Sequence, residues 1–93
     1  MMLDGADVPL IPRGVRIHHD KVRDCWVLQA PERAIMLDEI GLAILRKING
    51  ESSFGTIVGE LATTYNAPVD AIATDVSAFI TQLTDRRILE VTT

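Results

Sequence analysis

Hydrophobic and polar positions alternate over residues 15–19, a period of two that is typical of a half-buried strand. A charged stretch at 20–24 follows and leads into a second apolar run at 25–30. Two such runs on either side of a short polar stretch predict a β-hairpin with a loop of about four or five residues. The chain is therefore expected to begin its folded part with an antiparallel pair of strands.

The next stretch, residues 33–37 (RAIML), predicts a third short strand. After Arg33 both alternating sets of side chains are apolar, so both faces need cover and the free edge needs a partner. One interpretation is that this strand pairs inside the chain, either with residues 88–91 or with the N-terminal residues. The other is that an extended peptide from another molecule adds to its edge. The periodicity alone does not choose between them.

From Asp38 onward the apolar spacing changes to three and four residues, which predicts helices. Asp38 is placed to cap a helix over residues 39–48, which Asn49-Gly50 can end. A second helix follows the Ser52-Ser53 cap region and can be closed by an asparagine, and a third spans 68–86 with the cleanest apolar stripe in the chain. A last short strand is predicted at 88–91.

The predicted fold is α+β and winged-helix-like: a three-stranded N-terminal β-sheet, then a three-helix bundle, then a short C-terminal strand. Residues 1–14 show neither period and contain two glycines and two prolines. We interpret them as an N-terminal arm that is irregular unless something pins it. Residues 15–93 predict a single domain, which matches the size of one modest core.

Net charge, cysteine content and the length of apolar runs argue against several classes of function. The net charge of −4 works against an extended nucleic-acid footprint, because binding to phosphates needs a basic surface. The single cysteine, Cys25, has no partner for an intramolecular disulfide. No apolar run approaches the roughly 20 residues of a membrane helix, and the N-terminus lacks a signal-peptide pattern. We expect a cytoplasmic protein with no membrane and no nucleic acid among its partners.

The sequence gives little evidence for catalytic residues. His18 and His19 are neighbours on a predicted strand, so they point to opposite faces and cannot hold one metal ion together. No glycine-rich phosphate loop is present. The sequence therefore predicts no catalytic residue, no metal and no cofactor, and a protein that is not an enzyme. A winged-helix DNA-binding regulator is the alternative, but the start of the third helix carries Asp70 and Asp75 and no cation to meet a phosphate.

Several short segments of the chain have a characteristic order and spacing when they are taken together. They are 12–20 (PRGVRIHHD), 26–33 (WVLQAPER), 37–45 (LDEIGLAIL), 49–50 (NG), 57–61 (IVGEL), Tyr65, and 75–79 (DVSAF) with Leu83. In this order and spacing the chain resembles the PqqD family, the peptide chaperones of pyrroloquinoline quinone biosynthesis, over residues 11–91. Arg87 departs from the resemblance, because similar proteins often carry glycine there.

The resemblance implies a non-catalytic protein that binds the precursor peptide PqqA and presents it to the radical SAM enzyme PqqE. In such recognition elements for ribosomally made, modified peptides, the leader peptide adds to the third strand and lies against the third helix. The implied peptide-binding residues are Arg33, Ala34, Ile35, Met36, Leu37, Arg46, Val76, Phe79 and Ile80.

Each of these residues has an expected role. Ala34 to Leu37 would pair through the backbone. Val76, Phe79 and Ile80 would form the floor or rim of the adjoining groove, and the two arginines would meet acidic peptide residues. A homodimer through the exposed strand edge or a swapped arm is a second hypothesis.

Overall fold

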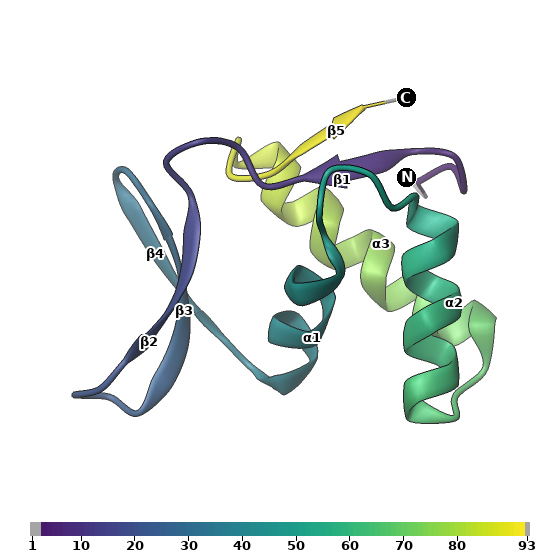
Figure 1. Cartoon of the computed structure of the whole chain (residues 1–93), viewed down its shortest axis with the longest axis horizontal. Helices are drawn as coiled ribbons and strands as arrows, with labels where there is room; N and C mark the ends of the chain where they lie inside the picture. The colour runs from purple at the N-terminus through teal and green to yellow at the C-terminus, as the bar shows by residue number, and fades with distance from the viewer. Residues whose placement is uncertain (1–2, 93) are drawn as a thin grey trace.

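The computed structural model describes residues 3–92, so the first two residues of the predicted arm and Thr93 lie outside it. The α+β order of three sheet strands, three helices and a C-terminal strand is confirmed (Figure 1), with one strand more than predicted. The strands are β1 (Val8–Leu10), β2 (Arg16–Asp20), β3 (Cys25–Ala30), β4 (Arg33–Leu37) and β5 (Glu90–Thr92). The helices are α1 (Glu39–Lys47), α2 (Phe54–Tyr65) and α3 (Val69–Asp85).

β2, β3 and β4 form an antiparallel sheet with β3 in the middle. Val27 of β3 lies opposite His18 on one side and Met36 on the other. A four-residue turn joins β2 to β3, within the predicted loop length, and a two-residue turn joins β3 to β4. β2 and β4 are therefore the two edge strands of this sheet.

β1 and β5 pair with each other in a separate two-stranded sheet, with Pro9 opposite Val91. The two segments considered as internal partners for residues 33–37, the N-terminal residues and the C-terminal strand, thus pair with each other. β5 also begins at Glu90 rather than at Ile88 as predicted, because Ile88 and Leu89 belong to the turn that ends α3. Part of the predicted arm is therefore pinned to the domain by strand pairing.

The turn after α3 is a Schellman motif. Arg87 N–H donates to the Thr84 carbonyl and Ile88 N–H to the Leu83 carbonyl, each at 2.9 Å. Arg87 has a φ of 61°, a left-handed conformation that glycine adopts at less cost. The side chains of Leu83 and Ile88 are both buried in the core. The turn therefore keeps its hydrophobic contact although its left-handed residue is an arginine.

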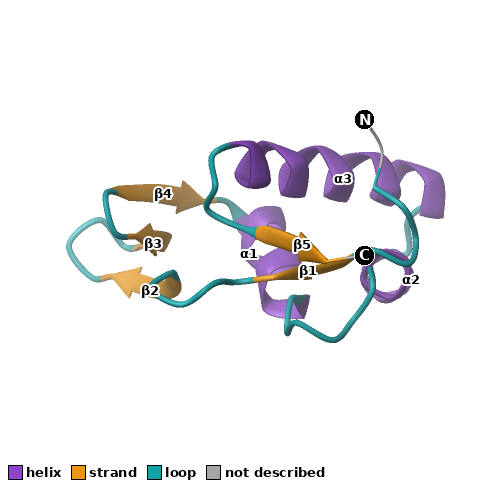
Figure 2. Cartoon of the chain, turned by 90° about the horizontal axis from the view of Figure 1, so that it is seen from above, coloured by secondary structure: helices purple, strands orange, loops and turns teal. Residues whose placement is uncertain are grey.

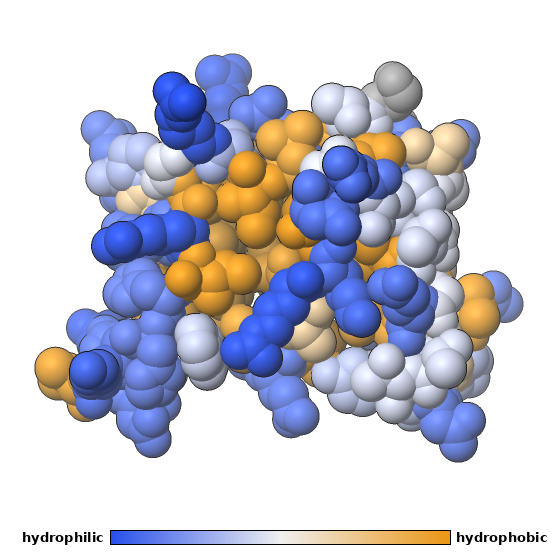
Figure 3. Space-filling model, in the orientation of Figure 1, coloured by the Kyte–Doolittle hydropathy of each residue, from blue (hydrophilic) through white to orange (hydrophobic). Residues whose placement is uncertain are grey.

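One hydrophobic core lies between the inner face of the three-stranded sheet and the helices. Leu28 of β3, Ile44 of α1, Ile57 of α2 and Ile80 of α3 are at most 1% exposed. Figure 3 shows apolar atoms gathered in the middle of the face on view, with polar atoms around the margins. Within residues 3–92, no helix combines the length and apolar character needed to cross a membrane.

Gly41, inside α1, is explained by close packing. A Cβ atom at this position would lie 3.0 Å from Asp38 Oδ1 and 3.1 Å from Phe79 Cε1. Asp38 is the predicted N-cap, and its Oδ1 accepts a 2.7 Å hydrogen bond from Gly41 N–H. The missing side chain therefore lets the Phe79 ring of α3 approach the start of α1.

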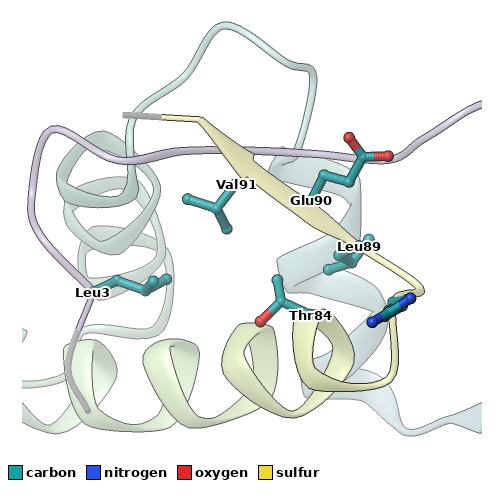
Figure 4. A pocket seen from close by; sticks show the side chains of 6 residues that line it. Leu3, Thr84, Leu89, Glu90 and Val91 are labelled. Carbon is teal, nitrogen blue, oxygen red and sulfur yellow. The ribbon is translucent and has the colours of Figure 1, made fainter.

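The N-terminal segment also contacts the helices. Phe54 N–H donates to the Asp7 carbonyl at 2.6 Å, and Leu3 N–H donates to the buried Ser77 Oγ at 3.0 Å. Between this segment, β5 and the end of α3 lies an open cleft of about 550 Å³ (Figure 4). It is lined by Leu3, Thr84, Arg87, Leu89, Glu90 and Val91. The N-terminal segment therefore contacts one side of α3.

Candidate functional site

The outer edge of β4 offers unpaired backbone groups. A two-residue turn makes Ala30 and Arg33 the hydrogen-bonded pair that closes the hairpin. In an antiparallel ladder such pairs alternate with pairs whose N–H and C=O groups point away from each other. Ala34 and Met36 are in these second positions, so their backbone groups point to the outer edge. Among residues 3–92, no strand pairs with that edge.

The two faces of β4 differ. Ile35 and Leu37 are half-buried and pack against the core, whereas Ala34 and Met36 lie on the outer face of the sheet. The Met36 side chain is 64% exposed. The strand was expected to need cover on both faces, and within the described chain only its inner face is covered.

One side of α3 borders β4. Spacings of three and four residues place Ile72, Asp75, Phe79, Gln82 and Arg86 along one side of this helix and its C-cap. The contact of Phe79 with the start of α1, where the chain leaves β4, places that side next to the strand. Figure 2 shows α3 and β4 on the same side of the molecule, with β1 and β2 on the other. We use the word groove as a name for the region between this side of α3 and the outer edge of β4.

A small apolar pocket lies at the α1 end of the groove. Asp75 is the only charged residue in its wall, and Ile40 and Tyr65 border it at the surface. Its full lining is Ile40, Ala43, Ile44, Leu61, Tyr65, Ile72, Asp75 and Val76. The pocket therefore joins all three helices at the point where β4 leads into α1.

The charges near the groove are separated along its length. Arg33 begins β4 and Arg86 follows α3, and Figure 1 shows the start of β4 and the end of α3 both toward the top of the view, with the start of α1 toward the bottom. Asp38 and Glu39 stand at the opposite end, at the start of α1, and Asp75 lines the pocket there. All five side chains belong to exposed residues. The groove thus has a basic end and an acidic end.

The sequence profile of the family described as Coenzyme PQQ synthesis protein D (PqqD) matches residues 25–89. The chain belongs to the PqqD family. A relative from Rhizobium meliloti (strain 1021), named "PqqA binding protein", is 42% identical over 90 residues, which are 97% of this chain and 92% of the relative. The family was the one indicated by the sequence resemblance.

Two solved PqqD structures agree with the fold. One is a solution NMR structure of the PqqD part of PqqCD from Methylobacterium extorquens, described as a functional and stand-alone recognition element for ribosomally synthesized and post-translationally modified peptides. It is 39% identical, has a TM-score of 0.80, and the match covers 94% of this chain and 93% of that one. The crystal structure of PqqD from Xanthomonas campestris is 40% identical with a TM-score of 0.60, covering 85% and 88%.

The predicted site residues fall into three groups in this PqqD family member. Residues 33–37 and Phe79 come together at the groove. Val76 and Ile80, at 2% and 0% exposed, are core residues and support the groove from below. Arg46 stands apart, because its guanidinium carbon lies 5.0 Å from the centroid of the Trp26 ring.

Sequence reasoning missed the pocket at the end of the groove. Ile40, in the first turn of α1, is 47% exposed beside the pocket. Ile72, in the first turns of α3, is half-buried in the pocket wall. Only a weak sequence signal pointed to the pocket. In the first turns of α1 and α3, the apolar residues cover a wider part of the helix surface than a single core-facing stripe needs.

The remaining candidate groups do not form a reactive centre. His19 Nε2 lies 3.2 Å from Asp24 Oδ1 at the hairpin turn, and its ring meets Trp26 edge-on. Cys25 is a half-buried free thiol. Among residues 3–92, no three His, Cys, Asp or Glu side chains are grouped to hold a metal ion. What the described geometry provides is an open strand edge at β4, on the same side of the molecule as α3, and a small apolar pocket among the three helices.

Proposed function

We propose that this PqqD family member binds the precursor peptide PqqA as an additional strand on the outer edge of β4 and presents it to the radical SAM enzyme PqqE. The observation that carries the proposal is the edge of β4 at Ala34 and Met36, which no strand of residues 3–92 pairs with and which lies on the same side of the molecule as α3. The name "PqqA binding protein" of the 42% identical relative supports PqqA as the ligand.

Strand addition supplies affinity through the backbone and specificity through alternate side chains. The N–H and C=O groups of Ala34 and Met36 bond to the peptide backbone. Every second peptide side chain then faces the groove beside Phe79, and the others point to the opposite face. The exposed side chains remain accessible to an enzyme, which suits a protein that presents a peptide without transforming it.

The same edge limits other associations. A second copy of the chain pairing through β4 would occupy the groups that the peptide needs, so a homodimer of this kind competes with peptide binding. The homodimer, the swapped arm, the PqqE partner and the cytoplasmic location stay predictions. No observation favours the DNA-binding alternative, because Asp70, Asp75 and Asp85 of α3 are all exposed.

The proposal is tested with Met36→Pro and Met36→Ala. Proline removes the outward N–H without removing a β3–β4 hydrogen bond, whereas alanine removes only the exposed side chain. Fluorescence anisotropy with labelled PqqA should show an affinity loss of about 100-fold for Met36→Pro, since a lost ladder bond also disturbs its neighbours. Met36→Ala should stay within about threefold of wild type. Equal affinities for the folded Met36→Pro variant and wild type would contradict strand addition at β4.

A further inference from the structure

The pocket at the α1 end of the groove has a size that selects its occupant. Its volume is about 70 Å³. A single water needs about 10–15 Å³ of such space, and an apolar cavity of about 150 Å³ accepts a benzene ring. The pocket therefore has room for the end of an aliphatic side chain and cannot enclose an aromatic ring.

The surface around this pocket is unusually apolar. Five large hydrophobic residues are exposed within residues 3–92, and two of them, Ile40 and Tyr65, line the pocket. A third, Val69 at 57% exposed, lies one helical turn before Ile72. Apolar side chains gathered beside a concave pocket are typical of a binding surface. An occupant therefore gains apolar contacts at the rim as well as inside.

Geometry relates the pocket to the β4 edge. Ile72 lies seven residues before Phe79 on α3, which corresponds to about 10 Å along the helix. An extended peptide covers that distance in about three residues. A strand paired with β4 and passing Phe79 thus reaches the pocket about three residues farther on.

We propose that the groove selects its peptide by one aliphatic anchor and by the order of charges along the peptide. The anchor fills the pocket beside Ile40 and Ile72. A basic peptide residue next to the anchor meets Asp75, and acidic peptide residues lie at the end marked by Arg33 and Arg86. This inference rests on the proposed function, because it specifies which segment of PqqA the edge of β4 receives.

The anchor is tested by filling the pocket. Ala43 is half-buried in its wall, so Ala43→Leu places additional carbon atoms in the space. Labelled PqqA should bind at least about tenfold more weakly, while the thermal unfolding temperature is unchanged or higher. The matched control is Ala6→Leu, at an exposed alanine of the N-terminal segment that belongs neither to the pocket lining nor to this side of α3. Equal affinities for the two variants would overturn the anchor.

Peptide variants give a second test that needs no change in the protein. Each aliphatic residue of PqqA is replaced in turn by alanine and by tryptophan. At the anchor position both replacements should weaken binding to the wild-type protein about tenfold, because alanine leaves the pocket empty and tryptophan does not fit. If no position rejects both replacements, the anchor is wrong.

The charge order is tested with Asp75→Lys against Asp85→Lys. Both residues are exposed on α3, both changes alter the net charge equally, and only Asp75 lines the pocket. Asp75→Lys should weaken PqqA binding about three- to fivefold more than Asp85→Lys, and replacing the basic residue beside the anchor with Glu should restore it. Equal effects of the two variants would overturn the charge order.

The two proposals fail differently. If wild-type protein does not bind labelled PqqA, the proposed function is wrong. If it binds PqqA and Met36→Pro abolishes this binding, but Ala43→Leu and Asp75→Lys match their controls, only the selection by anchor and charge order is wrong.

Discussion

The two edge strands of the three-stranded sheet offer the same backbone pattern and different side chains. β2 and β4 each have five residues and each pair with β3. Charged Arg16 and Asp20 stand at the ends of β2, and Asp20 Oδ1 accepts hydrogen bonds from Val22 and Arg23 N–H. β4 carries no charge after Arg33. Charged edge strands resist further pairing, so the sheet protects one edge and leaves the other able to accept a strand.

The surroundings of the edges differ as well. β4 lies on the same side of the molecule as α3 and leads into α1, which lines the apolar pocket, whereas β2 lies on the opposite side (Figure 2). On β2 the outward backbone groups belong to Ile17 and His19, by the same alternation that selects Ala34 and Met36 on β4. An unpaired edge becomes a binding site only where a complementary surface lies beside it. The comparison therefore predicts that equivalent changes on the two edges have unequal effects.

The largest contrast should come from proline on each edge. Met36→Pro and His19→Pro each remove one outward N–H from an edge strand. We expect PqqA affinity to fall about 100-fold for the first and to change less than about threefold for the second. Isothermal titration calorimetry on both folded variants measures this. Similar losses for both would mean that binding does not depend on β4 in particular.

A smaller contrast should separate the apolar neighbours of the two edges. Phe79 borders β4 and Ile17 belongs to β2, and both are half-buried against the core. Phe79→Ala and Ile17→Ala should each lower the free energy of unfolding by about 1–3 kcal/mol, since both lose partly buried apolar area. Only Phe79→Ala should also weaken PqqA binding, about tenfold. Urea unfolding and peptide titration on the same samples distinguish the effects.

Arg46 tests whether a cation near the sheet acts in binding or in stability. It packs on Trp26 of β3, whose ring also meets His19 of β2. Arg46→Gln should lower the free energy of unfolding by about 0.5–1 kcal/mol by removing the cation–π contact. PqqA affinity should stay within about twofold. A tenfold loss of affinity with unchanged stability would instead favour a direct contact with the peptide.

The smallest effect concerns α3 alone. Arg87→Gly relieves the left-handed conformation at φ 61° and should raise the free energy of unfolding by about 0.5–1 kcal/mol. Neither edge strand is touched, so peptide affinity should not change. Thermal unfolding followed by circular dichroism provides the measurement. A decrease in stability would show that the Arg87 side chain makes contacts that outweigh the strain.

The parts of the fold that sequence predicted are those with local signals. The two strands 25–30 and 33–37 match the observed bounds because a charged turn, Pro31 and the Asp38 cap delimit them. β1 was missed because three residues around Pro9 carry no periodicity, and its pairing with β5 joins the two ends of the chain. β5 was misplaced by two residues because the buried Ile88 and Leu89 resemble a strand while forming the turn after α3.

The residues around the groove also divide into those that a local sequence pattern could identify and those that it could not. Residues 33–37 could be identified because a strand with two apolar faces is unusual. Val76 and Ile80 were expected to form the floor or rim of the groove, and both lie in the most deeply buried part of the apolar stripe, where Val76 also lines the pocket. The groove uses the flank of that stripe at Phe79 and Asp75. Which flank is used depends on how α3 sits beside β4, and no local pattern encodes that packing.

The most direct test of strand addition is amide hydrogen exchange measured by NMR with and without PqqA. Backbone N–H groups that enter a new ladder become protected, whereas those left free keep exchanging. The amides of Ala34 and Met36 should exchange at least about tenfold more slowly when PqqA is bound, and those of Ile17 and His19 should not change. Protection of the β2 amides, or unchanged exchange at Ala34 and Met36 in the saturated complex, would contradict binding at β4.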